Sequence, residues 1–124
     1  MTEDLGRILI VDDEAETRRY YQEVLEGAGY ACDVAADGQA AFQRIGQVAY
    51  RLIILDIEMP GWNGLEAIRS LDLTRPDMRV LVVSGGLSAK ITKQLQASYC
   101  VDGWLSKPVQ PGELRESVRA VLER

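Results

Sequence analysis

The run Ile8-Leu9-Ile10-Val11, followed at once by Asp12-Asp13-Glu14, decides how this chain of 124 residues folds. Two more apolar runs of the same length follow, Leu52-Ile53-Ile54-Leu55 and Val80-Leu81-Val82-Val83. A strand that is apolar on both faces belongs to a parallel sheet that is covered by helices on both sides. The three runs therefore predict the central strands of an α/β fold.

Two weaker segments complete a set of five strands. Residues 31–35 carry a charged side chain, which suits the edge of a sheet, and residues 103–106 form the other segment. Helical spacing of apolar residues predicts five helices, over residues 14–28, 38–46, 64–71, 88–99 and 111–122. Strands that alternate with helices predict one doubly wound parallel sheet, in which ligands bind beyond the carboxyl ends of the strands.

Composition excludes several classes of function. The formal net charge is -5 and no basic run exists, so the chain is a poor candidate for binding nucleic acid or anionic lipid. There is no histidine, which excludes Ser-His-Asp and Cys-His catalysis within the chain. No apolar run approaches the ~20 residues that span a bilayer, and the N-terminus does not resemble a signal peptide. We therefore expect a cytoplasmic protein that does not bind a membrane.

Polar groups follow every strand that the sequence predicts with a clear apolar run. Asp12 and Asp13 follow the first run, Asp56 follows the second, Ser84 the third, and Lys107 follows residues 103–106. In a parallel sheet the carboxyl ends of the strands lie at one edge. We therefore expect these groups to lie close together.

The chemistry of that edge points to phosphoryl transfer. Three neighbouring carboxylates, Asp12, Asp13 and Asp56, would repel one another unless a cation lay between them, and such oxygen ligands suit Mg²⁺. The Ser84 hydroxyl and the Lys107 ammonium are groups that hold phosphate oxygens. A carboxylate that attacks phosphorus forms an aspartyl-phosphate. Each position alone also fits a helix cap, a turn or a solvated lysine, but one site accounts for all of them together.

These residues resemble the receiver domain of bacterial two-component response regulators. The resemblance rests on Asp12-Asp13-Glu14, on Asp56-Ile57-Glu58-Met59-Pro60-Gly61, on Ser84-Gly85 and on Lys107-Pro108, in this order and spacing. It covers essentially the whole chain, so it implies a single receiver domain over residues 1–124. It also implies the flavodoxin-like strand order 2-1-3-4-5 with five flanking helices.

The resemblance further implies a Mg²⁺ site and a phosphoacceptor. Asp56 would accept the phosphoryl group and contribute to the metal site. Asp13 would bind Mg²⁺ directly and Asp12 would help, through water. The backbone carbonyl of Glu58 would supply a further ligand. Lys107 would pair with the phosphoryl group, and the Lys107–Pro108 peptide bond would be cis.

The resemblance also implies a switch. Ser84 would turn its hydroxyl toward the phosphoryl group, and Trp104 stands where the family usually has Tyr or Phe. Because an indole is larger than either ring, we expect Trp104 to lie largely at the surface of the face built from residues 88–99, 103–106 and 111–122. Val109 replaces a frequent Phe, which indicates a change in packing. Gly86 and Glu58 occupy positions that tune how water reaches the phosphoryl group.

The predicted function is a phosphorylation-dependent signalling switch. A sensor histidine kinase or a histidine phosphotransfer protein would donate the phosphoryl group to Asp56. The chain would not be an enzyme, except that it would catalyse its own phosphorylation and dephosphorylation. Its output face, built from the fourth helix, fifth strand and fifth helix, would contact an effector domain or a second copy of the chain. The sequence fits a receiver excised from a longer protein slightly better than a stand-alone regulator.

Two alternatives stay open at this stage. A Mg²⁺-dependent phosphohydrolase would also use an aspartyl-phosphate, with Glu58 as the second acid, but no insertion is long enough to form a cap over a substrate. A pseudo-receiver would bind partners without phosphorylation. The presence of Asp13, Asp56, Ser84 and Lys107 argues against it.

Overall fold

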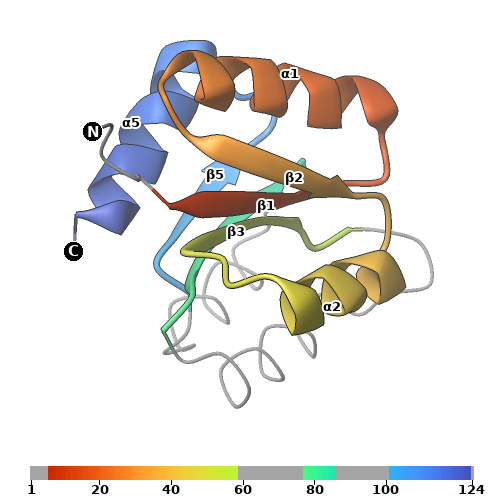
Figure 1. The fold of residues 1–124 in the computed structure, drawn as a ribbon. Helices are drawn as coiled ribbons and strands as arrows, with labels where there is room; N and C mark the ends of the chain where they lie inside the picture. Colours follow the sequence, from red (N-terminus) through yellow and green to blue (C-terminus); the bar gives the residue numbers. More distant parts are fainter. Residues whose placement is uncertain (1–5, 59–76, 86–100, 124) are drawn as a thin grey trace.

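The computed structural model describes residues 6–58, 77–85 and 101–123, and within them a single five-stranded parallel sheet (Figure 1). The strands are β1 (Arg7–Val11), β2 (Ala31–Ala35), β3 (Leu52–Asp56), β4 (Arg79–Ser84) and β5 (Gly103–Ser106). Their order across the sheet is β2-β1-β3-β4-β5, and every neighbouring pair is parallel. The predicted strands and the strand order are confirmed.

Within the described residues, three helices cover the two faces of the sheet. They are α1 (Ala15–Gly27), α2 (Gly38–Gln47) and α5 (Pro111–Leu122). Figure 1 shows α1 and α5 on one side of the sheet and α2 on the other. The predicted helices over residues 64–71 and 88–99 lie outside the described residues. No helix in the described ranges is long and apolar enough to cross a membrane.

The sheet separates two apolar clusters, because successive side chains of a strand point to opposite faces. Leu9 and Val11 belong to the cluster on the α2 side, whereas Ile8 and Ile10 belong to the cluster beneath α1 and α5. All four side chains are at most 1% exposed. Burial on both faces is what the continuous apolar runs predicted, and it holds the strand ends in fixed positions.

The ends of the helices follow the local sequence. The Asp37 carboxylate caps α2 by accepting a hydrogen bond from the backbone N–H of Ala40 at 2.8 Å. Gly29, just after α1, has a φ of 100°, a left-handed conformation that favours glycine. Pro111 is the first residue of α5, where a missing N–H costs nothing. The strands, helices and turns are therefore locally consistent with the fold.

Candidate functional site

The carboxyl ends of the strands bring the predicted polar residues to one edge of the sheet. Asp12 directly follows β1, Asp56 ends β3, Ser84 ends β4, and Lys107 directly follows β5. The side chains of Asp12, Asp56 and Ser84 are buried, with 1%, 5% and 0% of the residue exposed. Buried carboxylates need compensating partners, and the partners here come from the site itself.

Asp12 and Asp56 are held in the same way. In each, Oδ1 accepts a hydrogen bond from the backbone N–H two residues later, Glu14 for Asp12 and Glu58 for Asp56, both at 2.9 Å. In each, Oδ2 accepts a hydrogen bond from Nζ of Lys107, at 2.8 Å for Asp12 and 3.1 Å for Asp56. In each residue, a backbone N–H two positions later thus fixes Oδ1, and Oδ2 faces the ammonium of Lys107.

Lys107 is therefore the charged centre of the site. Burial lowers the pKa of its ammonium, but the hydrogen bonds and charges of Asp12 and Asp56 outweigh burial and raise that pKa above its usual value. The backbone N–H of Lys107 donates to the carbonyl of Ser84 at 3.0 Å, which ties the end of β5 to the end of β4. The Lys107–Pro108 peptide bond is cis, as the resemblance implied.

A third carboxylate completes an acidic group that could hold a metal ion. One oxygen from each of Asp12, Asp13 and Asp56 lies within 4.8 Å of the others, and Asp13 is exposed to solvent. The three carboxylates and the one ammonium of Lys107 leave a formal charge of minus two. Oxygen ligands with an open, hydrated side match the preferences of Mg²⁺. The residues present therefore fit this ion.

Three further residues were predicted to take part in the site: Ser84, Glu58 and Gly86. Ser84 is fully buried at the end of β4, beside the strand end that leads to Lys107. Glu58 is exposed and touches the site through its backbone N–H, so its carbonyl stays a predicted ligand. Gly86 lies outside the described residues.

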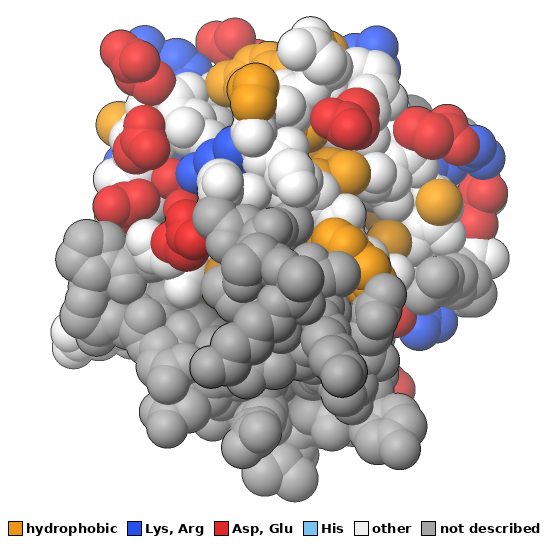
Figure 2. Space-filling model, turned by 180° about the vertical axis from the view of Figure 1, so that it is seen from behind, with side chains coloured by type: hydrophobic (Ala, Val, Ile, Leu, Met, Phe, Trp, Pro, Cys, Tyr) orange, Lys and Arg blue, Asp and Glu red, His pale blue; other side chains and the backbone are white. Residues whose placement is uncertain are grey.

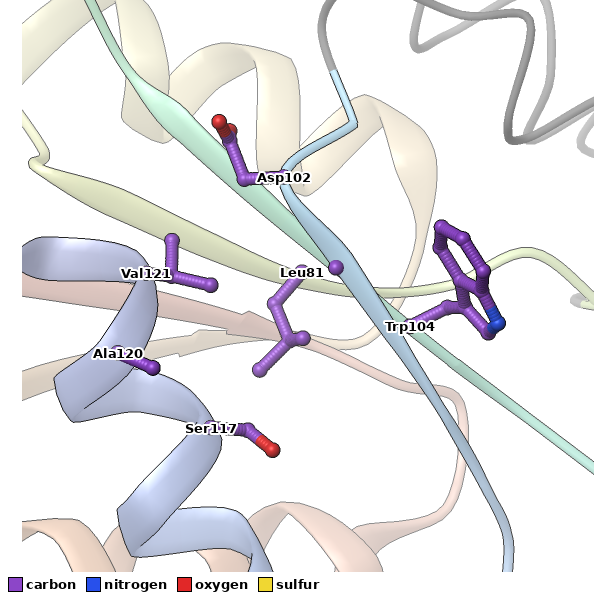
Figure 3. Close-up of a pocket in the computed structure, with 7 residues that line it drawn as sticks. Leu81, Asp102, Trp104, Ser117, Ala120 and Val121 are labelled. Atoms are coloured by element: carbon purple, nitrogen blue, oxygen red, sulfur yellow. The ribbon is translucent and has the colours of Figure 1, made fainter. Parts of the chain in front are cut away.

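Trp104 lies on the face of β5 that is turned away from α5. In Figure 3 its indole points to one side of the strand, whereas Leu81 and Val121 lie on the other. The indole packs against the apolar cluster on the α2 side of the sheet and is half-buried. The expectation that Trp104 lies largely at the surface describes this state only in part, because the cluster covers one side of the ring.

Sequence reasoning missed two side chains of α1 that support the site. Nη1 of Arg18 donates to the backbone carbonyl of Asp12 at 2.7 Å. The hydroxyl of Tyr20 donates to the backbone carbonyl of Val109 at 2.7 Å. In the sequence, Tyr20 fits the apolar face of the helix predicted over residues 14–28. Both acceptors are backbone atoms, so no pattern of residue types could have indicated these contacts.

Comparison with known families and sequences gives one consistent result. Residues 8–119 match the family described as the response regulator receiver domain. The chain is 34% identical over 118 residues to the transcriptional regulatory protein ResD of Bacillus subtilis, covering 95% of this chain and 48% of that protein. It is 36% identical over 121 residues to the DNA-binding response regulator MtrA of Mycobacterium tuberculosis, covering 95% of this chain and 51% of that protein. The chain thus spans about half the length of these relatives.

Solved structures show the same similarity over most of the chain. A CheY-like receiver domain protein from Methanospirillum hungatei matches with a TM-score of 0.90 and 29% identity, over 97% of this chain and 95% of that one. The response regulator TrrA of Thermotoga maritima, in complex with Mg²⁺-BeF, matches with a TM-score of 0.82 and 33% identity, over 93% of this chain and 97% of that one.

Proposed function

The chain belongs to the response regulator receiver domain family, whose members are phosphoacceptor switches in two-component signalling, and we propose that Asp56 is the residue that accepts the phosphoryl group. The observation that carries this proposal is the shared Lys107 ammonium between two buried carboxylates, with a third carboxylate beside them. Asp12 makes the same two kinds of contact, and Asp56 differs from it by its place at the end of the central strand β3.

The proposed reaction is the transfer of a phosphoryl group between two side chains. An oxygen of Asp56 forms a bond to phosphorus while the bond between phosphorus and the donor's histidine nitrogen breaks, and the histidine keeps the electron pair and takes up a proton. The Glu58 N–H holds the carboxylate of Asp56 in orientation, and Lys107 moves from sharing two carboxylates to neutralising the phosphoryl oxygens. Asp12, Asp13, Asp56 and the Glu58 carbonyl would hold Mg²⁺, which adds positive charge beside those oxygens when bound.

The switch residues are part of the same proposal. The hydroxyl of Ser84, which is buried at the end of β4, donates a hydrogen bond to the phosphoryl group. The neighbouring strand β5 carries Trp104. The indole already packs on the sheet, so phosphorylation can change its exposure in either direction. The chain has one other tryptophan, Trp62, so acrylamide quenching of Trp104 is measured in a Trp62→Phe background. Unchanged quenching on phosphorylation supports an indole that stays partly at the surface, where a partner can contact it, and a large drop shows an aromatic rotamer switch.

The partners follow from the family and not from any contact in the structure. We propose a sensor histidine kinase or a histidine phosphotransfer protein as donor, in the cytoplasm. The output would pass through the face that includes β5 and α5 to an effector domain or a second copy of the chain. Figure 2 shows acidic and basic side chains interspersed over the described part of one surface of the molecule, without a basic patch there that would suit direct binding to nucleic acid.

The test is the intact mass of the protein after treatment with acetyl phosphate. We expect the wild type to gain one phosphoryl group with Mg²⁺ and none with a chelator, and Asp56→Asn to gain none. Asp33→Asn is the matched control, because Asp33 is a half-buried carboxylate elsewhere in the sheet. An undiminished adduct on Asp56→Asn would contradict the assignment.

The same experiment separates the alternatives. Continuous consumption of a large excess of the phosphate ester would favour a Mg²⁺-dependent phosphohydrolase. A wild type that gains no phosphoryl group under any condition, yet binds its partner, would favour a pseudo-receiver. The match of residues 8–119 to the receiver domain family favours the phosphoacceptor over both.

A further inference from the structure

We propose that Tyr20 is a positioning residue that keeps Lys107 in place between Asp12 and Asp56. The inference rests on the proposed function, since it concerns how readily Asp56 is phosphorylated. It assigns a role to a hydroxyl on α1 that does not touch the reacting atoms. The role is carried by Lys107, Pro108 and Val109, which form most of the short loop of residues 107–110 between β5 and α5.

Two backbone groups of that loop are held by neighbouring elements. At its start, the N–H of Lys107 donates to the carbonyl of Ser84 at 3.0 Å. Two residues later, the carbonyl of Val109 accepts the hydroxyl of Tyr20 at 2.7 Å, a contact between residues 89 positions apart in the chain. The lysine side chain therefore leaves the backbone from a segment that β4 holds on one side and α1 holds on the other.

Packing supports the loop incompletely, which is why the hydrogen bond matters. The Val109 side chain is buried in the cluster beneath α1 and α5. Yet a groove of about 360 Å³ runs between α1 and the loop, lined in part by Tyr20, Tyr21 and Pro108. The loop has open space on this side, and the Tyr20 hydroxyl bridges it.

Tyr20 is itself held firmly enough to act as a support. Its ring lies 5.6 Å from the ring of Tyr21, centroid to centroid, with 47° between the planes. Tyr21 is only 2% exposed, so its ring is a fixed part of the core. Both tyrosines lie on α1, and the same helix places Arg18 against the Asp12 carbonyl. Helix α1 thus anchors the ends of two strands that deliver charged groups to the site.

Removing the hydroxyl leaves the ring and frees the loop. In Tyr20→Phe the carbonyl of Val109 must bind water in the groove. The loop that carries Lys107 then keeps only the hydrogen bond from the Lys107 N–H to Ser84. We expect phosphorylation of Asp56 by acetyl phosphate to slow by roughly two- to tenfold, the range that corresponds to a single net hydrogen bond. Tyr50→Phe is the matched control, since it deletes a 2.7 Å hydrogen bond from another tyrosine, to Asp33, on the other face of the sheet. We expect its rate to equal that of the wild type.

A double-mutant cycle shows whether Tyr20 acts through Lys107. In a Lys107→Met background, Tyr20→Phe should produce no further change in the rate, because the group that it positions is gone. An equal slowing in both backgrounds would overturn the proposal, as would equal rates for wild type and Tyr20→Phe.

A second measurement is independent of phosphorylation. Exchange of the Lys107 ammonium protons with solvent, followed by ¹⁵N NMR in protein without metal, should accelerate in Tyr20→Phe and stay unchanged in Tyr50→Phe. Unchanged exchange in Tyr20→Phe would overturn the positioning role. If the wild type is not phosphorylated at all, the proposed function fails, and this measurement still decides the role of Tyr20.

Discussion

Two of the polar clusters in the described residues differ in their balance of charge. The terminal cluster, at the carboxyl ends of the strands, consists of Asp12, Asp13, Asp56 and Lys107. The edge cluster, on the outer strand β2 and its neighbours, consists of Arg7, Asp33 and Tyr50. In the edge cluster Asp33 accepts hydrogen bonds from Arg7 at 3.2 Å and from the Tyr50 hydroxyl at 2.7 Å.

The difference separates a structural cluster from a functional one. The edge cluster pairs one carboxylate with one guanidinium, so its charges are balanced and it needs nothing from outside. The terminal cluster sets three carboxylates against one ammonium, and two of those carboxylates are buried. An imbalance of this kind lowers stability and is retained where a site must attract a cation and then a phosphoryl group. Variants of the two clusters should therefore respond differently to Mg²⁺.

The largest effect is expected for Lys107→Met. Removing the ammonium leaves Asp12 and Asp56 close together and uncompensated, so the free energy of unfolding without metal should fall by about 3 kcal/mol. Mg²⁺ should restore more stability to this variant than to the wild type. Urea unfolding with a chelator and with Mg²⁺ measures both.

The control for Lys107 is Arg7→Met in the edge cluster. The Arg7 side chain is 48% exposed, so its ion pair with Asp33 contributes at most about 1 kcal/mol. Mg²⁺ should make no difference to this loss. A Lys107→Met variant as stable as Arg7→Met would show that repulsion between the carboxylates of the terminal cluster does not lower stability.

The next effect concerns Asp13→Asn. Losing this proposed direct ligand should weaken Mg²⁺ binding at least about tenfold, or ~1.4 kcal/mol, as measured by calorimetric titration. Without metal, the same variant should be somewhat more stable, because one negative charge has left the cluster. Glu14→Gln is the control: its backbone N–H still binds Asp12, and its side chain is not a proposed ligand. Equal losses of affinity in the two variants would mean that Asp13 is not a ligand.

The two clusters also show how much of the fold and of the site could be predicted from the sequence. Continuous apolar runs predicted the strands, because a buried central strand has no polar face, and the order of the strands came from the resemblance. The carboxylates at the strand ends could be predicted because the topology brings those ends together. Asp33 could be read only as a charge on an edge strand, since its partners Arg7 and Tyr50 meet it across the sheet.

Carboxylates look alike in sequence even where their roles differ. Asp102 also lies at a strand end, yet its Oδ2 accepts the backbone N–H of Val80 at 2.9 Å and its Oδ1 lies 3.5 Å from Nη1 of Arg79. It joins the beginning of β5 to β4, at the opposite end of the strands from the site. The sequence places Asp102 before β5 and Asp56 at the carboxyl end of β3, but only its partners show that Asp102 ties two strands together.

Alkaline pH should lower the free energy of unfolding through one buried tyrosine beside each cluster. Burial raises the pKa of Tyr21, beneath the terminal cluster, to about 12, and burial together with Asp33 raises that of Tyr50 to about 12. Above pH 10 the unfolded chain loses these protons while the folded chain keeps them, so stability falls as pH rises from 10 toward 12. Each tyrosine contributes a slope of roughly 1.4 kcal/mol per pH unit.

The alkaline slope can be divided by substitution. Tyr50→Phe should make the fall in stability between pH 10 and 12 shallower, as measured by urea unfolding at each pH. Burial likewise raises the pKa of the Cys32 thiol to about 12, so part of the slope must persist in this variant. A slope unchanged by Tyr50→Phe would mean that this phenol is not held in its neutral form by the fold.

The smallest effect is expected for Asp33→Asn. The amide oxygen of Asn can still accept the Tyr50 hydroxyl, so the variant loses only the ion pair with the exposed Arg7, at a cost of about 0.5–1 kcal/mol. Asp33→Ala should cost roughly 1–3 kcal/mol more, because it leaves the Tyr50 hydroxyl without its acceptor. Neither variant should change Mg²⁺ affinity or the rate of phosphorylation, since the partners of Asp33, Arg7 and Tyr50, lie outside the terminal cluster. Urea unfolding and the acetyl phosphate assay check both statements. A change in Mg²⁺ affinity in Asp33→Asn would show that the edge cluster is electrostatically coupled to the terminal cluster.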